Sequence, residues 1–294
     1  MHVFLTGASG LIGSQIITEL LAHGHSVTGL VRSDTAAAKV EGRGAKTVRG
    51  DLVDHDVIKA AAQAADGTIH CGFSTDYSKF VESGINDQKI VQLICEAYEG
   101  TNKPFILTSG VLAAPANLQL YTEAHMSGSS PRGVSEKILQ SFAHRGVRAI
   151  IVRLSVIHGP NDQGFIKTFV DVAKEKKVSA YIADGQSKWP YAHVVDAAKL
   201  YRAGIEEAPA GSVLHAVAEE GVPYKEVAEA IGQQLGVPVK SIPGGEAADH
   251  FGPFFGMVIT VNRPSSSEIT QELLGWKPTE VGILEDFKIG TYAQ

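Results

Sequence analysis

The sequence predicts an α/β fold in which a doubly wound parallel sheet is joined to a smaller C-terminal lobe. Short apolar segments alternate with segments of helical periodicity through residues 1–160, which is typical of parallel strands connected by right-handed crossovers. The first apolar segment, 2–6, runs directly into a glycine-rich turn and then into an apolar helix. After residue 160 the pattern is less regular, and this change predicts where the lobe begins.

Each element is expected from its apolar pattern and from the turn residues that flank it. Strands are expected at 2–6, 26–31, 46–48, 67–71, 105–108, 148–154 and 212–217. Helices are expected at 12–21, 57–65, 86–99, 135–144, 165–176, 195–206, 224–235 and 266–274. The segment 244–267 is rich in glycine, proline and aromatic residues and is expected to be a loop-like lining. We therefore divide the chain into a sheet domain, 1–160 with a return segment at about 193–218, and a lobe, 161–294.

Composition and charge exclude several classes of protein. The chain has 294 residues, of which 44% are hydrophobic and 20% charged, and its formal net charge is −6. A mildly acidic chain is a poor non-specific binder of nucleic acid or of an anionic membrane. No apolar run approaches the roughly 18 residues of a membrane span. Cys71 and Cys95 are too few for a disulfide framework or a cysteine metal site, so we expect a cytoplasmic protein without a metal.

The strongest local signal is the glycine-rich segment between the first strand and the first helix. In that context Gly7 permits the tight turn, Gly10 lets the backbone approach a pyrophosphate, and Gly13 lets helix and strand pack closely. The helix N-terminus adds N–H groups and a positive dipole. The alternative is a turn that merely needs glycine. We predict a Rossmann-type dinucleotide site that contains Thr6, Gly7, Ser9, Gly10, Leu11, Ile12 and Gly13.

The residues that follow the second strand predict which dinucleotide binds. An NAD site usually places an acidic residue there, where it meets the ribose 2′-hydroxyl. This chain has Arg32 and Ser33 instead. They suit a 2′-phosphate, because arginine binds phosphate through a charge-assisted fork. The expected cofactor is therefore NADP(H) rather than NAD(H), unless Arg32 is only a solvated loop charge.

Together these motifs resemble the extended short-chain dehydrogenase/reductase superfamily, near its NAD-dependent epimerases and dehydratases, over nearly the whole chain. The resemblance implies that the lobe binds substrate and that Ser109, in Thr108-Ser109-Gly110, is the catalytic serine. It also implies that His193 lies near the substrate lobe, within a His-Val-x-Asp-like signature. Further cofactor contacts are implied at Asp51, Leu52, Cys71, Gly72, Phe73, Asn86, Leu154 and Val156.

The catalytic pair departs from the Tyr-x-x-x-Lys pattern of that superfamily. The four-residue spacing that ends at Lys137 begins at Gly133, which carries no titratable group and cannot relay a proton. The chain is thus similar to the atypical branch, whose members keep the nucleotide fold without the standard active site. Ser109 and Lys137 remain as catalytic candidates, with Lys137 also a candidate ligand of the cofactor ribose.

Two further residues are candidate proton donors, and each has a structural alternative. Tyr121 lies between Ser109 and Lys137 in the sequence, but a loop tyrosine is more often a packing anchor. His193 titrates near neutrality, but it is also placed to tie the lobe to the sheet.

Aromatic residues favour an apolar substrate pocket, although aromatic side chains also fill ordinary cores. The chain is therefore interpreted as an NADPH-dependent reductase of a small hydrophobic carbonyl, enone or imine, either a monomer or a homodimer. The alternatives are a non-catalytic NADP(H) sensor and an isomerase or lyase on the same fold, since fold analogy alone cannot choose among them. The aromatic residues concerned are Phe73, Trp189, Tyr191, Phe251, Phe254 and Phe255.

Overall fold

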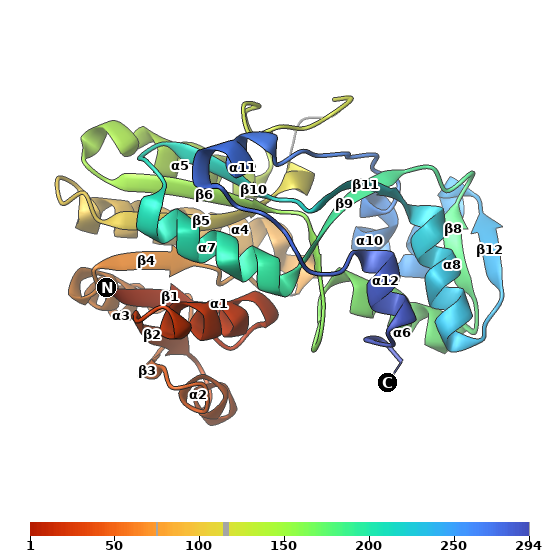
Figure 1. Cartoon of the computed structure of the whole chain (residues 1–294), viewed down its shortest axis with the longest axis horizontal. Helices are drawn as coiled ribbons and strands as arrows, with labels where there is room; N and C mark the ends of the chain where they lie inside the picture. The colour runs from red at the N-terminus through yellow and green to blue at the C-terminus, as the bar shows by residue number, and fades with distance from the viewer. Residues whose placement is uncertain (75, 114–117, 294) are drawn as a thin grey trace.

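A seven-stranded parallel sheet forms the larger part of the protein, and the prediction of a doubly wound α/β fold is confirmed. The computed structural model describes residues 1–74, 76–113 and 118–293. The strand order is β10-β6-β5-β4-β1-β2-β3 (Figure 1). Strands β2 and β3 are added on one side of β1, and β4 and the later strands are added on its other side, so the winding of the chain reverses between β1 and β4. Ligands of open α/β sheets bind at such a reversal, beyond the carboxyl ends of the strands. The strands are β1 (His2–Thr6), β2 (Ser26–Val31), β3 (Lys46–Arg49), β4 (Gly67–His70), β5 (Pro104–Gly110), β6 (Arg148–Leu154) and β10 (Ser212–Ala216).

Helices cover both faces of this sheet and form two separate apolar cores. On one face pack α1 (Leu11–Ala22), α2 (Asp34–Glu41) and α7 (Val194–Glu207). On the other face pack α3 (His55–Ala64), α4 (Phe80–Tyr98) and α5 (Pro131–Ser141). Because parallel strands buried on both faces need apolar residues throughout, strands such as β1 lack polar alternation.

A smaller part with a third core lies at one end of the sheet (Figure 1). The buried residues of this core all lie between Val156 and Tyr292. Its strands form two small sheets, β11-β9-β7 and β12-β8. They are β7 (Val156–His158), β8 (Ser179–Ile182), β9 (Lys188–His193), β11 (Glu219–Pro223) and β12 (Val239–Ile242). Its helices are α6 (Phe165–Lys176), α8 (Tyr224–Leu235), α9 (Ala247–Phe251), α10 (Pro253–Val258) and α12 (Ile283–Lys288).

Late parts of the chain return to the large sheet. Helix α11 (Glu268–Leu274) contacts β10, and the Trp276 indole donates a hydrogen bond of 3.0 Å to the Asp196 carbonyl of α7. Single helical turns lie at Tyr77–Lys79, Val111–Ala113, Ala143–Arg145 and Gly244–Glu246. None of the helices in the described part of the chain has both the length and the apolar character needed to span a bilayer.

Helices α4 and α5 begin at least one full turn earlier than the sequence predicts. Helix α4 begins at Phe80 rather than near 86, so Gly84 lies inside the helix. A Cβ at Gly84 would lie only 2.2 Å from the Pro131 Cβ. Glycine at this point therefore permits close packing between α4 and α5 instead of ending a helix. Helix α5 begins at Pro131 rather than 135, because the Ser130 hydroxyl caps it by accepting from the Gly133 N–H at 3.2 Å.

The prediction of a loop over 244–267 is wrong, because α9 and α10 lie within that segment. Gly252, with φ of 82°, turns the chain between them. A Cβ at Gly256 would lie 2.6 Å from the backbone of Ala248, so glycine allows the two short helices to pack against each other. Gly252 and Gly256, whose presence suggests a loop in the sequence, are thus needed for the tight corner between the two helices.

One fully buried ion pair joins the sheet to α5. The Arg153 side chain on β6 and the Glu136 side chain are each 1% exposed, and the Arg153 Nη2 donates to Glu136 Oε2 at 2.7 Å. Arg153 also donates to the Ser127 hydroxyl and to the His125 carbonyl, so its charge is fully surrounded by acceptors. Such a pair is costly to break, because the remaining charge stays buried.

We expect Glu136→Gln to lower the free energy of unfolding by about 3 kcal/mol, because Arg153 would keep a buried charge without its counter-ion. Urea denaturation followed by circular dichroism measures the loss. The control is Arg145→Gln, because the Arg145–Glu99 pair is exposed (46% and 43% of the side chains). Its cost should stay below about 1 kcal/mol. A loss for Glu136→Gln no larger than the control's would contradict the assignment.

Candidate functional site

The glycine-rich turn brings the end of β1, the end of β4 and the start of α1 into direct backbone contact. Gly7 has φ of 69°, and a Cβ there would lie 2.8 Å from the carbonyl carbon of Cys71. A Cβ on Gly13 would lie 2.2 Å from the Gly7 carbonyl oxygen. Neither position has room for a side chain, so the turn needs glycine for reasons of both conformation and space.

The N-terminus of α1 is open to an anion. Gly10 is its N-cap, and no side chain in the described part of the protein caps the helix. The first backbone N–H groups of this 12-residue helix therefore keep their donors and the positive end of the helix dipole at the carboxyl edge of the sheet. These residues fit a pyrophosphate, because such N–H groups are the usual ligands of phosphate oxygens. Ser9 lies in the turn, and Leu11 and Ile12 are the first two residues of α1.

Arg32 lies at the exposed end of β2, with 77% of its side chain accessible and its Nη1 3.9 Å from Asp51 Oδ2. Ser33, which the sequence predicts as a phosphate ligand, is the N-cap of α2 in the structure, and its hydroxyl accepts from the Ala36 N–H at 3.2 Å. Arg32 is thus accessible to an anionic ligand. Leu52 follows Asp51 in the loop after β3, and its carbonyl accepts from the Asn86 amide at 3.0 Å.

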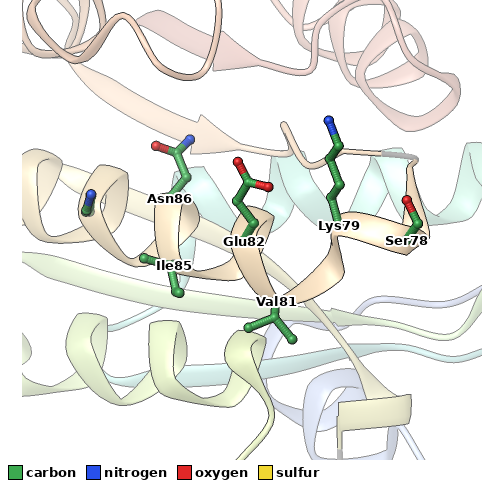
Figure 2. A pocket seen from close by; sticks show the side chains of 7 residues that line it. Ser78, Lys79, Val81, Glu82, Ile85 and Asn86 are labelled. Atoms are coloured by element: carbon green, nitrogen blue, oxygen red, sulfur yellow. The ribbon is translucent and has the colours of Figure 1, made fainter.

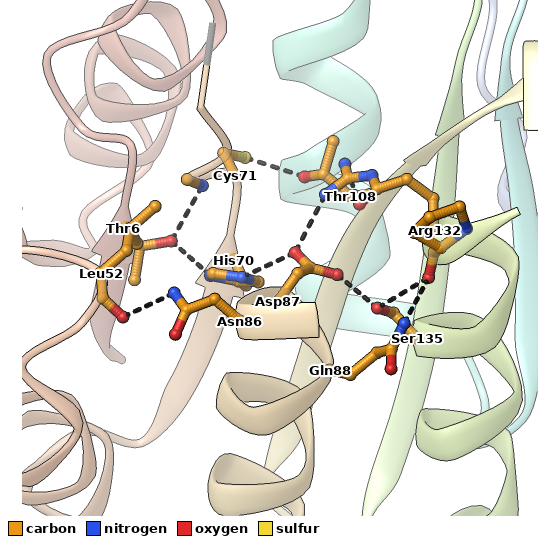
Figure 3. A network of polar contacts seen from close by, with 12 residues as sticks. Thr6, Leu52, His70, Cys71, Asn86, Asp87, Gln88, Thr108, Arg132 and Ser135 are labelled. Atoms are coloured by element: carbon orange, nitrogen blue, oxygen red, sulfur yellow. Dashed lines mark hydrogen bonds and ion pairs between the residues drawn. The ribbon is translucent and has the colours of Figure 1, made fainter. Parts of the chain in front are cut away.

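A buried polar network joins the strand ends beside this turn (Figure 3). The Thr6 hydroxyl accepts from the Gly72 N–H at 3.0 Å and donates to His70 Nδ1 at 2.6 Å. His70 Nε2 then donates to the Asp87 carboxylate at 3.2 Å. The proton positions on His70 follow from this chain of donors and acceptors. The network fixes β1, β4 and α4 relative to one another.

Asp87 also receives hydrogen bonds from α5. Arg132 Nη1 donates to Asp87 Oδ1 at 3.0 Å, and the Ser135 hydroxyl donates to Asp87 Oδ2 (Figure 3). Although burial opposes ionisation of this carboxyl, the charge of Arg132 and the hydrogen bonds from His70 and Ser135 hold the pKa of Asp87 below its ordinary value. Asp87 is therefore a buried anion that orients Arg132.

Cys71 lies at the end of β4, on the same edge. Its thiol is within 3.0 Å of the Thr108 hydroxyl, which is 2.7 Å from the Tyr201 hydroxyl. Burial raises the pKa of Cys71 to about 11, so the thiol is protonated and unreactive at neutral pH. Gly72 follows it, and a Cβ there would lie 3.0 Å from the Thr6 hydroxyl.

Ser109 lies at the carboxyl end of β5, buried, and its hydroxyl has no hydrogen-bond partner in the described part of the chain. Its strand partner is Arg153, whose side chain reaches Glu136 of α5. Side chains of paired residues in a sheet share a face, so the Ser109 hydroxyl faces the α5 side. A buried, unpartnered hydroxyl beside a ligand edge is a candidate hydrogen bond to a ligand.

The face of α5 that meets the sheet is displaced by one residue from the Gly133–Lys137 spacing. The side chains that reach β5 and β6 at this spacing are Arg132 and Glu136. Gly133 is buried, and a Cβ there would lie 2.3 Å from the Gly128 carbonyl oxygen, so the position has no room for a side chain. Lys137 is exposed. Lys137 thus stays a prediction as ribose ligand and catalytic residue, without a contact in this structure that supports it.

The two candidate proton donors lie in packed surroundings. Tyr121 is 0% exposed, with its ring centroid 5.2 Å from the Arg153 guanidinium, and burial raises its pKa to about 12. His193 caps α7, because its Nδ1 accepts from the Val195 N–H at 3.3 Å. Burial, and secondarily the neighbouring His158, lowers the pKa of His193. These are the positions of a packing anchor and of a helix cap.

The aromatic residues expected to line a pocket divide into two groups. Trp189, Tyr191, Phe251 and Phe255 belong to the third core. Phe73 and Phe254 are half-buried and belong to a chain of ring contacts that crosses from the sheet to the smaller part. In that chain Phe73 and Phe80 have centroids 5.7 Å apart, and Phe80 and Phe254 have centroids 6.0 Å apart.

The remaining predicted residues lie at the start of the smaller part. Leu154 ends β6 and is half-buried, and Val156 begins β7 and packs in the third core. Within the described ranges, no group of three or more His, Cys, Asp or Glu side chains is arranged to hold a metal ion.

A pocket is lined by the first turns of α4 and by the single helical turn before it, and it does not include Asp87. Figure 2 shows Lys79, Glu82 and Asn86 pointing to one side of the helix, and Val81 and Ile85 pointing to the other. Its lining includes neither Ser109 nor Arg132, so we do not assign the chemistry to it. The lining residues are Ser78, Lys79, Val81, Glu82, Ile85, Asn86 and Lys89.

Sequence reasoning did not identify His70, Asp87 or Arg132 as site residues. Asp87 directly follows Asn86, and Arg132 directly precedes Gly133, so both lie beside residues of the predicted site or of the predicted catalytic spacing. A helical wheel of α5 that starts at Pro131 instead of 135 would have placed Arg132 and Glu136 on one face.

The fold and the glycine-rich turn define a Rossmann-type nucleotide-binding protein. The chain belongs to the NAD dependent epimerase/dehydratase family, whose model matches residues 3–216. An uncharacterized protein of Schizosaccharomyces pombe is 42% identical over 99% of this chain and 100% of its own length.

Similarity extends to an enzyme and to a solved structure of known ligands. The 4-hydroxy-2-methyl-3-oxo-4-farnesyl-3,4-dihydroquinoline-1-oxide ketoreductase of Stigmatella aurantiaca is 25% identical over 72% of this chain and 67% of that protein. The UDP-glucuronic acid 4-epimerase of Bacillus cereus, in complex with UDP-glucuronic acid and NAD, has a TM-score of 0.78 at 17% identity. That alignment covers 100% of this chain and 98% of the epimerase, and it shows the shared fold.

We expect the stability difference between the wild type and Asp87→Asn to shrink on acidification. The pKa of Asp87 is lowered by folding, so its contribution is present above about pH 4 and is lost as the pH falls through the folded value. Melting temperatures of both proteins between about pH 6 and pH 3 test this. A difference that stays constant over that range would show that Asp87 does not carry the charge assigned to it.

Proposed function

We propose that this protein is an NADP(H)-dependent oxidoreductase that reduces a small hydrophobic carbonyl, enone or imine. The observation that carries the proposal is the buried, unpartnered hydroxyl of Ser109, at the same strand-end edge as the open N-terminus of α1. Membership of the NAD dependent epimerase/dehydratase family and similarity to a ketoreductase support it.

The cofactor would be held along the carboxyl edge of the sheet. Its pyrophosphate would meet the N–H groups that follow Gly10, and its 2′-phosphate would meet the exposed Arg32. When bound, NADPH supplies a hydride. Asp51 and Leu52 would flank the adenine. The nicotinamide end would lie among Cys71, Gly72, Phe73, Leu154 and Val156, with Lys137 at the ribose.

The protein residues bind and orient the acceptor. Ser109 would donate its hydroxyl hydrogen to the substrate oxygen or nitrogen, which satisfies a group that is otherwise buried without a partner. Phe73 and Phe254 would contact the apolar part of the substrate and exclude water. We assign the proton to water, since Tyr121 is fully buried against Arg153 and His193 is a helix cap.

The proposal includes the remaining expectations about context. We propose a cytoplasmic protein that acts as a monomer or a homodimer, with a small molecule as its only partner besides the cofactor.

Arg32→Ala is expected to raise the Kd of NADPH about tenfold and that of NADH less than about twofold, because only NADPH carries the phosphate that Arg32 would bind. Fluorescence titration of both cofactors measures the two constants. Arg43→Ala, which removes another exposed arginine, is the matched control and should change neither. Equal increases for NADPH and NADH would remove Arg32 from the 2′-phosphate site.

Ser109→Ala is expected to lower the rate of NADPH oxidation at least about tenfold, because the substrate loses its hydrogen-bond donor. The assay follows NADPH absorbance with a panel of hydrophobic aldehydes, ketones, enones and cyclic imines. Ser141→Ala removes an exposed hydroxyl from the end of α5 and serves as control. Tight NADPH binding without turnover of any panel member would contradict the proposal and favour a cofactor sensor.

A further inference from the structure

Arg132 keeps most of its hydrogen-bonding capacity unused. Of its five N–H donors, one hydrogen bond goes to Asp87 at 3.0 Å and one to the Thr108 carbonyl at 2.5 Å. The other three have no acceptor among the described residues. The side chain is 14% exposed, and its guanidinium carbon lies 4.4 Å from the Phe73 ring centroid. Arg132 is thus a positioned cation with donors to spare.

Arg153, on the same side of the sheet, has the opposite character. Its side chain is 1% exposed, and all three of its nitrogens donate, to Glu136, Ser127 and the His125 carbonyl. A structural arginine in this protein therefore has its donors consumed by the protein. The difference indicates that the spare donors of Arg132 serve a ligand.

The position of Arg132, beside the hydroxyl of Ser109, indicates the kind of ligand atom that both groups would bind. Its Nη2 is bonded to the carbonyl of Thr108, the residue next to Ser109, so both groups lie at the carboxyl end of β5. Ser109 offers one more unpartnered donor, on the α5 side of the sheet. Two donor groups at one strand end, next to an aromatic ring, suit an oxygen atom attached to an apolar body.

The charge balance at this point favours a carbonyl over a carboxylate. The buried carboxylate of Asp87 already neutralises Arg132, so a second full anion gains little from the pair. A carbonyl binds as a neutral group, so it leaves the charge balance of Arg132 and Asp87 intact, and the fixed N–H donors of Arg132 would then already point at the oxygen on which negative charge develops during reduction. Arginine does not release its proton, so it stabilises the oxyanion while water supplies the proton.

We propose that Arg132, held by Asp87 and the Thr108 carbonyl, binds the substrate's carbonyl oxygen together with Ser109 and takes the place of a tyrosine acid. This inference rests on the proposed reductase function and names the group that polarises its substrate. The hydride comes from the reduced nicotinamide dinucleotide, the C=O π electrons move to oxygen, and a water proton completes the alcohol. For an enone the same oxygen carries the enolate, and water protonates the carbon.

The test measures the carbonyl itself, without turnover. Carbonyl-¹³C acetophenone is bound to the protein saturated with NADP⁺, and its C=O stretching frequency is recorded by infrared difference spectroscopy. The wild type is expected to lower that frequency relative to acetophenone in an apolar solvent. Arg132→Gln is expected to remove roughly half of the shift or more, and Ser109→Ala a smaller part, because hydrogen bonds from ions are the stronger ones.

Two further variants separate the carbonyl site from a structural effect. Arg132→Gln leaves Asp87 without its cation, so the double variant Asp87→Asn/Arg132→Gln removes both charges and should fold and still lack the shift. Arg145→Gln, an exposed arginine beyond α5, should keep the full shift. In turnover, Arg132→Gln is expected to lower kcat about 100-fold, and Arg132→Lys should restore part of it.

The outcomes distinguish this inference from the function on which it rests. An unchanged carbonyl shift in both Arg132 variants, or no binding of acetophenone to the wild type, overturns the Arg132 site even if NADPH reduces another panel member. A shift that depends on Arg132, in a protein that reduces nothing, supports the site and overturns the reductase.

Discussion

The buried carboxylate of Asp87 is the interaction on which the arrangement of this edge depends. A buried charge must be surrounded by donors, and Asp87 takes them from His70 on β4 and from Ser135 and Arg132 on α5. Through His70 and Thr6 the same carboxylate is linked to the glycine-rich turn. The strand end that carries Ser109 and the turn that fits a pyrophosphate are therefore fixed by one charged group, and neither can shift without leaving Asp87 unsatisfied.

The parts of the fold that the sequence predicts correctly are those where the local pattern and the tertiary requirement coincide. Strands β1, β2 and β6 are mostly buried because both faces of the sheet are covered, and their bounds agree with the prediction. Gly7 and Gly13 are recognised from their spacing between a predicted strand and a predicted helix, and the backbone of the turn leaves no room for a side chain at either position. The family model matches residues 3–216, which include this turn.

The rest depends on contacts between distant segments that leave little local signal. The strands of the smaller sheets have three to six residues and pair with partners far along the chain, so their patterns are too short to read. Asp87 and Arg132 resemble ordinary surface charges until α4 and α5 are packed together. The sequence predicts the inward face of α5 from the spacing that ends at Lys137. In the structure Ser130 and Pro131 start the helix earlier, and Arg132 and Glu136 are the residues that face the sheet.

The raised pKa of the half-buried Cys71 has a consequence for how this edge tolerates oxidants. A thiol of pKa about 11 is ionised in about one molecule in 10⁴ at pH 7, and peroxides and alkylating reagents attack the thiolate rather than the thiol. The sulfur that lies beside the candidate ligand site is thus slow to become sulfenic acid or a mixed disulfide. Oxidation of this sulfur should therefore be slower than that of a cysteine with an acidic thiol at the same place.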